Sequence, residues 1–280
     1  MSNIIDAIVN LVKYKNINLT QNTSGNNRAN NAGDGLEEFV KNLFAGTFND
    51  NEAQRLERIS QIFSYLGNKS NPPDAMLKNG DALEVKKIEN ASSALALNSS
   101  HPKNKLYATS PMISKSCKHA ENWDEKDIMY IVGLVESAKI KKLSIVYGMD
   151  YCAEESCYLR IKNAIKETVE NIPSIDFSES RELGHINKVD PLGITYMRIR
   201  GMWGIENPWK AFSYAYKEPS HQNFSFMCII NEKKWNSLTN HSELQQLETQ
   251  EQSLKLADIK IKHPDNPAIL RNAKLITFGF

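Results

Sequence analysis

Residues 73–86 bring together side chains that can hold a metal ion and activate a water molecule. A Pro73-Asp74 pair is followed by a short apolar run, and a second apolar run carries Glu84 and Lys86. Hard cations such as Mg²⁺ take oxygen ligands, often one or two carboxylates together with a substrate phosphate. A nearby lysine can orient the attacking water and offset the charge that develops on phosphorus. Asp74, Glu84 and Lys86 are therefore the candidate catalytic residues.

The two apolar runs predict a β-hairpin that turns at Asn79-Gly80, because both residue types tolerate the positive φ of tight turns. Side chains alternate faces along a strand, so a strict two-residue turn would put Asp74 and Glu84 on opposite faces. A three-residue loop with a bulge would place Asp74 opposite Lys86, on the face of Glu84. Gly80 could supply the left-handed conformation for such a loop. An ordinary exposed hairpin with solvated charges is the alternative.

Three helices are predicted before this hairpin. Apolar residues recur at helical spacing over residues 3–15, about 30–43 and 50–65. On the second helix, a rotation of about 100° per residue puts Glu37 at the border of the apolar face, from which it can look into a site beside the core. Further helices are predicted at residues 111–122 and 153–171, strands at residues 128–135, 142–147, 193–199 and 224–230, and a helix or a solvated connection at residues 241–258.

A polar, basic loop follows the hairpin. Ser99, Ser100 and Lys103 lie in it, and small hydroxyls and lysines of this kind suit phosphate contacts. An ordinary surface loop has the same composition, so both interpretations stay open. Asn27 and Arg28, just ahead of the second helix, are further candidates for contacts with a phosphate backbone.

Composition excludes several classes of protein. The 280 residues are 41% hydrophobic, but no apolar run reaches the roughly 18 residues of a membrane span. The N-terminus lacks the layout of a signal peptide, and the four cysteines form no CxxC pair, as expected of reduced thiols in a cytoplasmic protein. The net charge of +1 neither favours nor opposes binding to nucleic acid. No glycine-rich phosphate loop, G-x-S-x-G motif or HExxH motif occurs.

The segment from Pro73-Asp74 to Glu84-Val85-Lys86 matches the PD-(D/E)xK nuclease signature. Longer stretches, NNRANNAGDGLEEFVK, FSYLGNKSNPPDAMLKNGDALEVKKIE, SALALNSSHPK and VYGMDYC, resemble NgoPII-type type II restriction endonucleases. The resemblance covers at least residues 26–152. It implies an α/β (mixed α+β) restriction-endonuclease-like core, with a central mixed β-sheet flanked by helices and a C-terminal elaboration.

The resemblance also implies an activity and its ligands. We expect Mg²⁺-dependent cleavage of both strands of DNA at 5′-GGCC-3′, with Asp74, Glu84 and the carbonyl of Val85 binding the metal. Glu37 could join through a water or a second metal ion. One domain is expected over residues 1–280, with a catalytic core at about residues 26–172 and a C-terminal part, residues 173–280, that contributes to DNA recognition.

Arginine and lysine pair best with the guanine O6 and N7 acceptors that GGCC presents in the major groove. Arg198 and Arg200 would share one face of a strand and are candidates for this contact, although a solvated basic face would look the same. A palindromic target favours a homodimer. A cognate DNA methyltransferase is the expected functional partner, in a prokaryotic cytoplasm without membrane contact. A repair nuclease or junction resolvase with the same core, or a non-catalytic DNA-binding protein, are the alternative functions.

Overall fold

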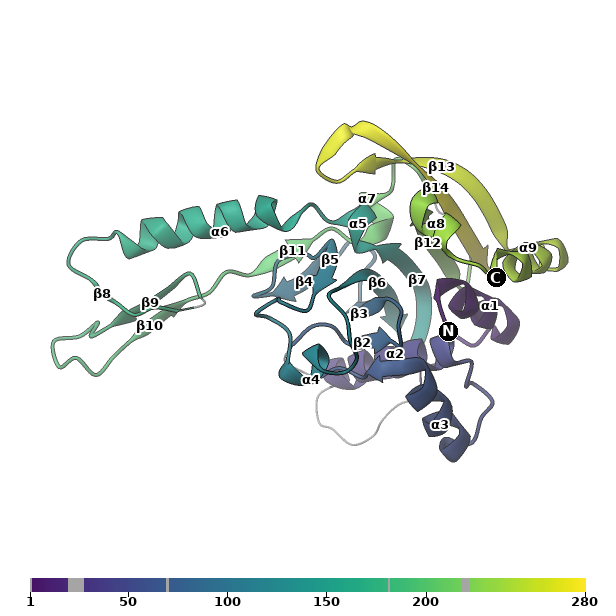
Figure 1. Ribbon diagram of the computed structural model, residues 1–280, viewed down its shortest axis with the longest axis horizontal. Helices are drawn as coiled ribbons and strands as arrows, with labels where there is room; N and C mark the ends of the chain where they lie inside the picture. Colours follow the sequence, from purple (N-terminus) through teal and green to yellow (C-terminus); the bar gives the residue numbers. More distant parts are fainter. Residues whose placement is uncertain (1, 20–27, 69–70, 181, 218–221) are drawn as a thin grey trace.

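A mixed β-sheet runs through the centre of the molecule (Figure 1). The structure is a computed structural model, and it describes all residues except 1, 20–27, 69–70, 181 and 218–221. Over the described residues the sheet has nine strands in the order β1-β2-β3-β6-β7-β12-β14-β13, and β5 pairs with β6. These strands are β1 Phe63–Tyr65, β2 Ala75–Leu77, β3 Ala82–Ile88, β5 Lys105–Tyr107, β6 Glu125–Glu136, β7 Lys139–Tyr147, β12 Ser225–Asn231, β13 Lys255–His263 and β14 Asn266–Gly279. The predicted mixed sheet with flanking helices is confirmed.

The N-terminal helices pack on the face of the sheet that holds the larger apolar core. Helices α1 (Ile4–Tyr14) and α2 (Arg28–Ala45) bury their apolar stripes there, and α3 (Glu52–Ile62) follows α2. The close approach of α2 depends on Gly133 of β6, because a Cβ atom at this position would lie 2.8 Å from the side chain of Leu36. This contact fixes the height of α2 above the sheet.

The other helices of the body are α4 Lys115–Lys118, α5 Gly148–Tyr151, α7 Pro208–Ala211, α8 Glu232–Ser237 and α9 His241–Gln250. Helices α8 and α9 add Trp235 and Leu244 to the same core. None of the helices in the described part of the chain is long and apolar enough to cross a membrane.

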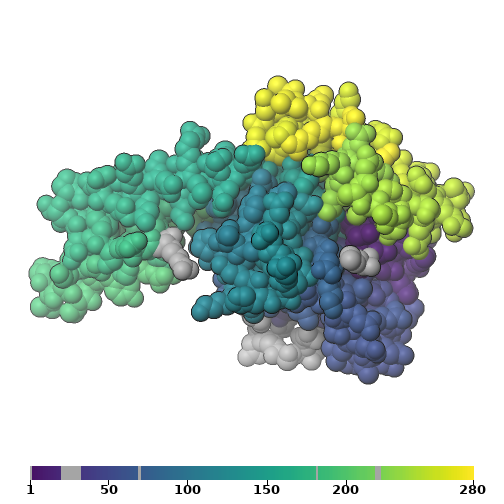
Figure 2. Space-filling model, viewed as in Figure 1, coloured from purple at the N-terminus to yellow at the C-terminus, as the bar shows by residue number. Residues whose placement is uncertain are grey.

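An arm projects from the body of the molecule and forms a separate lobe in the space-filling view (Figures 1 and 2). It consists of α6 (Glu155–Glu170) and a small antiparallel sheet of β8 (Asp176–Phe177), β9 (Gly184–Asn187) and β10 (Met197–Ile199). At its base, β11 (Trp203–Ile205) pairs with β4 (Leu95–Asn98). The chain that returns from the arm therefore passes directly beside the polar loop that follows β4.

Several expected elements differ in extent. The helix predicted to reach residue 65 ends at Ile62, because Phe63 turns to an extended conformation and its strand pairs with β2. Only the single turn of α4 forms within residues 111–122, and only Met197–Ile199 is strand within residues 193–199. Residues 241–258 divide between α9 and β13, and the β13–β14 hairpin at the edge of the sheet was not predicted.

Candidate active site

The hairpin of β2 and β3 places Asp74 and Glu84 side by side. Ala75 pairs with Leu83, so Asp74 is next in register with Glu84. The loop between the strands is residues 78–80, closed by hydrogen bonds from the Leu77 N–H to the Asp81 carbonyl (2.9 Å) and from the Gly80 N–H to the Leu77 carbonyl (3.0 Å). The expectation of an odd loop is confirmed.

Two details of the predicted hairpin are wrong. Asp74 lies opposite Glu84 and not opposite Lys86, because the three-residue loop begins one residue earlier than expected. The left-handed residue is Asn79, with φ of 54°, and not Gly80. Asparagine tolerates this conformation, and it leaves the glycine for a steric role. A Cβ atom at Gly80 would lie 3.0 Å from the Cβ of Leu77.

The three candidate catalytic side chains meet on one face of β3. The Lys86 Nζ lies 2.6 Å from the Glu84 Oε1 and 3.9 Å from the Asp74 Oδ2. Asp74 is held in place by the Val85 N–H, which donates to its Oδ2 at 2.7 Å. The Val85 side chain turns to the opposite face and is buried in the core. The backbone of β3 thus orients one carboxylate while its side chains carry the other two groups.

Burial and charge set the protonation of this cluster. Burial raises the pKa of Glu84, and the neighbouring Asp74 raises it further against the opposing effect of Lys86. Burial alone would lower the pKa of Lys86, but the Glu84 and Asp74 carboxylates outweigh it and the pKa is raised. Lys86 therefore remains an ammonium, which suits it to hold a water molecule and to offset negative charge.

Helix α2 brings Glu37 to the same place. Burial raises the pKa of Glu37 to about 7, helped by the charge of Asp74 and opposed by Lys41 and Lys86. The effect of the Asp74 charge on Glu37 agrees with the predicted position of Glu37 beside the site, although Glu37 does not line the cavity described below. Its predicted role as a metal ligand stays a prediction.

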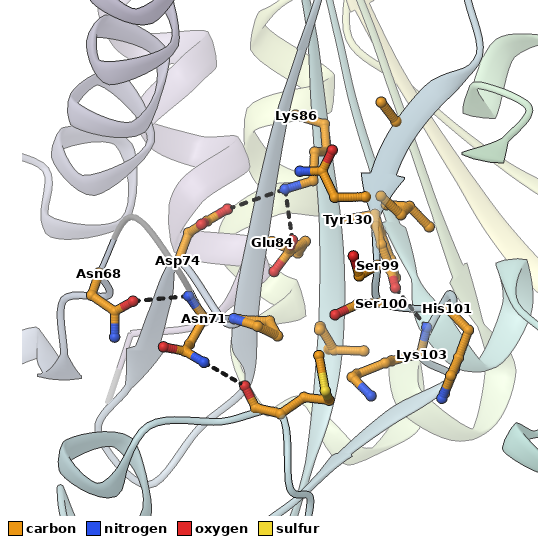
Figure 3. A pocket seen from close by; sticks show the side chains of 16 residues that line it. Asn68, Asn71, Asp74, Glu84, Lys86, Ser99, Ser100, His101, Lys103 and Tyr130 are labelled. Carbon is orange, nitrogen blue, oxygen red and sulfur yellow. Dashed lines mark hydrogen bonds and ion pairs between the residues drawn. The ribbon is translucent and has the colours of Figure 1, made fainter. Parts of the chain in front are cut away.

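The carboxylates line a cavity of about 250 Å³, shown in Figure 3. Ser99, Ser100 and Lys103 line it as well, so the structure brings the predicted polar loop to the catalytic residues. The cavity wall also includes residues that sequence reasoning did not select, because they come from separate segments without a common motif: Asn68, Asn71, Pro72, Ala96, Leu97, Asn98, His101, Met112, Ile128 and Tyr130.

Among those residues, His101 links the cavity to the arm. Its Nε2 lies 3.2 Å from the Glu155 Oε1 of α6, and its Nδ1 lies 2.9 Å from the Pro102 carbonyl. The ring stacks on Tyr158 with centroids 5.4 Å apart. Burial lowers the pKa of His101, which the Pro102 carbonyl partly offsets. The only advance signal was its place within the polar loop.

The other predicted DNA contacts lie apart from the catalytic cluster. Arg198 and Arg200 are on the arm and both bind Glu182, with the Arg198 Nε 2.8 Å from Oε2 and the Arg200 Nε 2.6 Å from Oε1. Their predicted common face agrees with this shared partner, but neither lines the catalytic cavity. Asn27 lies outside the described residues, and Arg28 begins α2 without a described side chain.

Two observations bear on a metal ion. Over the described ranges, no group of three or more His, Cys, Asp or Glu side chains is arranged to hold one. The buried Glu84 Oε2, however, has no hydrogen-bond partner in the part of the chain that the structure describes. A site with two carboxylates completed by substrate phosphate and water is the common arrangement for Mg²⁺. Asp74 and Glu84 fit that arrangement.

Comparison with known proteins defines the class. The family model described as NgoPII restriction endonuclease matches residues 2–262. The chain is 60% identical over 277 residues to the type II restriction enzyme NgoPII of Neisseria gonorrhoeae, which covers 99% of each chain. No solved structure matches. The protein is thus a type II restriction endonuclease, a nuclease of a restriction-modification system whose substrate is DNA.

Within that class, the chain belongs to the NgoPII restriction endonuclease family. The resemblance stated from the sequence is confirmed, and it extends over nearly the whole chain. A repair nuclease, a junction resolvase and a non-catalytic DNA-binding protein are set aside by this membership.

Proposed function

We propose that this enzyme hydrolyses phosphodiester bonds of double-stranded DNA with Mg²⁺ at the centre formed by Asp74, Glu84 and Lys86. The observation that carries the proposal is the hairpin register, which sets both carboxylates and the Lys86 ammonium on one face. The proposed target is the palindrome GGCC, as the family resemblance implies.

Asp74 and Glu84 would hold the metal ion, since the Glu84 Oε2 lacks another partner among the described residues. The Val85 carbonyl is a proposed further ligand, and Glu37 would take part through a water or a second ion. When bound, Mg²⁺ stabilises negative charge on the scissile phosphate as a Lewis acid.

The protein's own side chains would position the attacking water and the DNA backbone. The Lys86 ammonium holds the attacking water and offsets charge at phosphorus. Ser99 and Ser100 would hold phosphate oxygens at the rim of the cavity, and Asn27 and Arg28 would contact the backbone beyond it. These contacts set the register of the DNA without reading its sequence.

Plasmid cleavage tests the proposed centre. Asp74→Ala and Lys86→Ala should each lower double-strand cleavage at least about 1000-fold, because each removes a group that touches the reacting atoms. Binding to a GGCC duplex in Ca²⁺ should remain measurable. EDTA should stop the wild-type enzyme, and added Mg²⁺ should restore it. Near-normal cleavage by Lys86→Ala is the result that contradicts the assignment.

Base reading is proposed for Arg198 and Arg200 in the C-terminal part of the single domain. Both arginines donate hydrogen bonds to the Glu182 carboxylate. To contact guanine, they would have to break these bonds and donate to the O6 and N7 atoms of the base. Glu182 would hold the two guanidinium groups near each other until DNA binds.

A homodimer is the proposed assembly. The arm exposes large apolar side chains, with Leu192 at 81%, Ile194 at 77% and Tyr196 at 61% exposure. These three side chains lie between β9 and β10, apart from Arg198 and Arg200, and their exposed apolar surface favours a protein partner there. Two-fold symmetry would match a palindrome. A cognate DNA methyltransferase, without necessary contact, and a prokaryotic cytoplasmic location complete the proposal.

A further inference from the structure

Lys103 is a second lysine in the catalytic cavity, and it differs from Lys86 because its ammonium has no partner among the residues that the structure describes. Only 7% of Lys103 is exposed, yet its ammonium makes no hydrogen bond or ion pair with any described residue. The Lys86 ammonium, in contrast, is 2.6 Å from Glu84. Lys103 lines the cavity, so an anion that enters the cavity can supply the partner that its ammonium lacks among the described residues.

The backbone holds Lys103 firmly at this position. Its N–H donates to the hydroxyl of Tyr130 at 2.8 Å, and Tyr130 pairs in register with Glu84 across β3 and β6. Gly148 lets the loop approach, because a Cβ atom there would lie 2.4 Å from the Lys103 carbonyl. The side chain is therefore presented from a fixed point on the floor of the cavity.

The two lysines flank the carboxylates. In the view of Figure 3, Lys86 and Lys103 lie on opposite sides of Glu84. Displacement at phosphorus is in line, so the attacking water and the leaving oxygen occupy opposite sides of the phosphorus atom. With Lys86 on the side of the water, Lys103 is left on the side of the leaving group.

We propose that Lys103 contacts the leaving sugar oxygen of the scissile phosphodiester and gives it a proton. The proposal rests on the proposed centre of Asp74, Glu84 and Lys86. The attacking water forms a new P–O bond and loses a proton to solvent. The bond from phosphorus to the sugar oxygen breaks, its electron pair stays on that oxygen, and the Lys103 ammonium protonates it. Solvent then returns a proton to the amine, so the net reaction consumes one water.

The electrostatics of the cavity support this role. Burial lowers the pKa of Lys103, with Glu155 and Glu84 partly offsetting the effect. An ammonium with a lowered pKa gives up its proton more readily than a solvated lysine, which improves it as a general acid.

Sulfur substitution of the leaving atom separates this role from simple phosphate binding. A thiolate leaves without a proton, because thiols are far stronger acids than alcohols. Lys103→Met should slow single-turnover cleavage of ordinary GGCC duplex about 100-fold, the usual contribution of a general acid. Two further duplexes carry sulfur in place of the 3′ or the 5′ bridging oxygen, and in one of them cleavage breaks the P–S bond. Lys103→Met should cut that duplex within about threefold of the wild-type rate.

Lys162→Met is the matched control, because Lys162 is a neighbouring cation on the arm. It should change the rates on both substrates by the same factor. Equal losses on both substrates for Lys103→Met, or no loss on ordinary DNA, would overturn the proposal and leave Lys103 as a phosphate contact or a structural residue.

A second variant covers loss of folding. If Lys103→Met fails to fold or to bind GGCC duplex in Ca²⁺, Lys103→Arg decides, because its guanidinium keeps the charge but does not release a proton. It should be at least about tenfold slow on ordinary DNA and normal on the sulfur substrate; equal losses refute the role. Asp74→Ala tests the centre separately. Cleavage by Asp74→Ala together with a selective loss in the Lys103 variants would reject the centre and keep the leaving-group role.

Discussion

Glu37 is held partly away from water on α2, close to the charge of Asp74, and its pKa is raised to about 7 from an ordinary value of 4.5. A carboxyl whose pKa is raised by folding binds its proton more tightly in the native state. Folding is therefore favoured below pH 4.5, and this contribution is lost as the pH rises to about 7. At pH 8 the ionised side chain is a ready ligand and also a source of instability.

The loss of stability on ionisation of Glu37 can be measured in the absence of metal. Between pH 5 and pH 8 in EDTA, ionisation of Glu37 should lower the free energy of unfolding by about 2 kcal/mol, after allowing for partial solvent screening. Glu37→Gln stays neutral and should remove that part of the pH dependence. Urea unfolding at the two pH values gives the comparison, with the exposed Glu52→Gln as control. An unchanged pH dependence in Glu37→Gln would show that Glu37 is solvated.

At the scale of elements, the contact of Leu36 of α2 with Gly133 of β6 helps to position the helix that carries Glu37. A Cβ atom at Gly133 would lie 2.8 Å from the buried side chain of Leu36. Neither Gly133 nor Leu36 lines the catalytic cavity. A substitution at Gly133 would therefore affect cleavage by moving helix α2.

Gly133→Val should lower the free energy of unfolding by about 1–3 kcal/mol, the usual cost of overpacking a core. It should also lower cleavage more than it lowers DNA binding in Ca²⁺, because α2 moves away from Asp74. Gly33→Ala, on the same helix, is the matched control. Its new methyl group meets no atom within 4 Å, so stability should be kept or rise by about 0.5–1 kcal/mol. Normal stability and cleavage in Gly133→Val would contradict the packing argument.

At the scale of the whole molecule, the arm offers the exposed apolar surface through which two chains would associate. Leu192 and Ile194 at its tip are almost fully exposed. Burial of such side chains is the main favourable term in protein association. An arm that is paired in the dimer would also fix the two cavities relative to a palindrome.

Sedimentation velocity tests this assembly. The wild-type chain should sediment as a dimer, and Leu192→Glu combined with Ile194→Glu should sediment as a monomer with greatly reduced double-strand cleavage. Leu270→Glu changes an exposed apolar residue of the body and should leave the dimer intact. A wild-type monomer that cuts both strands of a single-site duplex would exclude the proposed homodimer.

The order of residues along the chain determined those features that depend on local pattern. Apolar spacing located α1, α2, α6, β6 and β7. The even separation of Asp74 and Glu84 along the chain requires an odd number of loop residues if the two carboxylates are to share a face. The long stretches that resemble the family indicated it from the sequence, because a resemblance of that length does not arise from composition alone. These are properties of neighbouring residues, and a linear sequence records them directly.

Tertiary structure decided which distant segments meet. The sequence allowed the hairpin loop to begin at Lys78 or at Asn79. In the folded protein the loop begins at Lys78, because β2 pairs with β1 and β3 in that register. Asp74 therefore lies opposite Glu84. Tyr130 lies beside Glu84 because β3 and β6 are parallel neighbours, and its hydroxyl accepts a hydrogen bond from the distant Lys103 N–H. No local sequence pattern predicted where the arm and the β13–β14 hairpin lie in the fold. Burial, and with it the pKa of each catalytic group, depends on everything packed around it, so it exists only once the chain has folded.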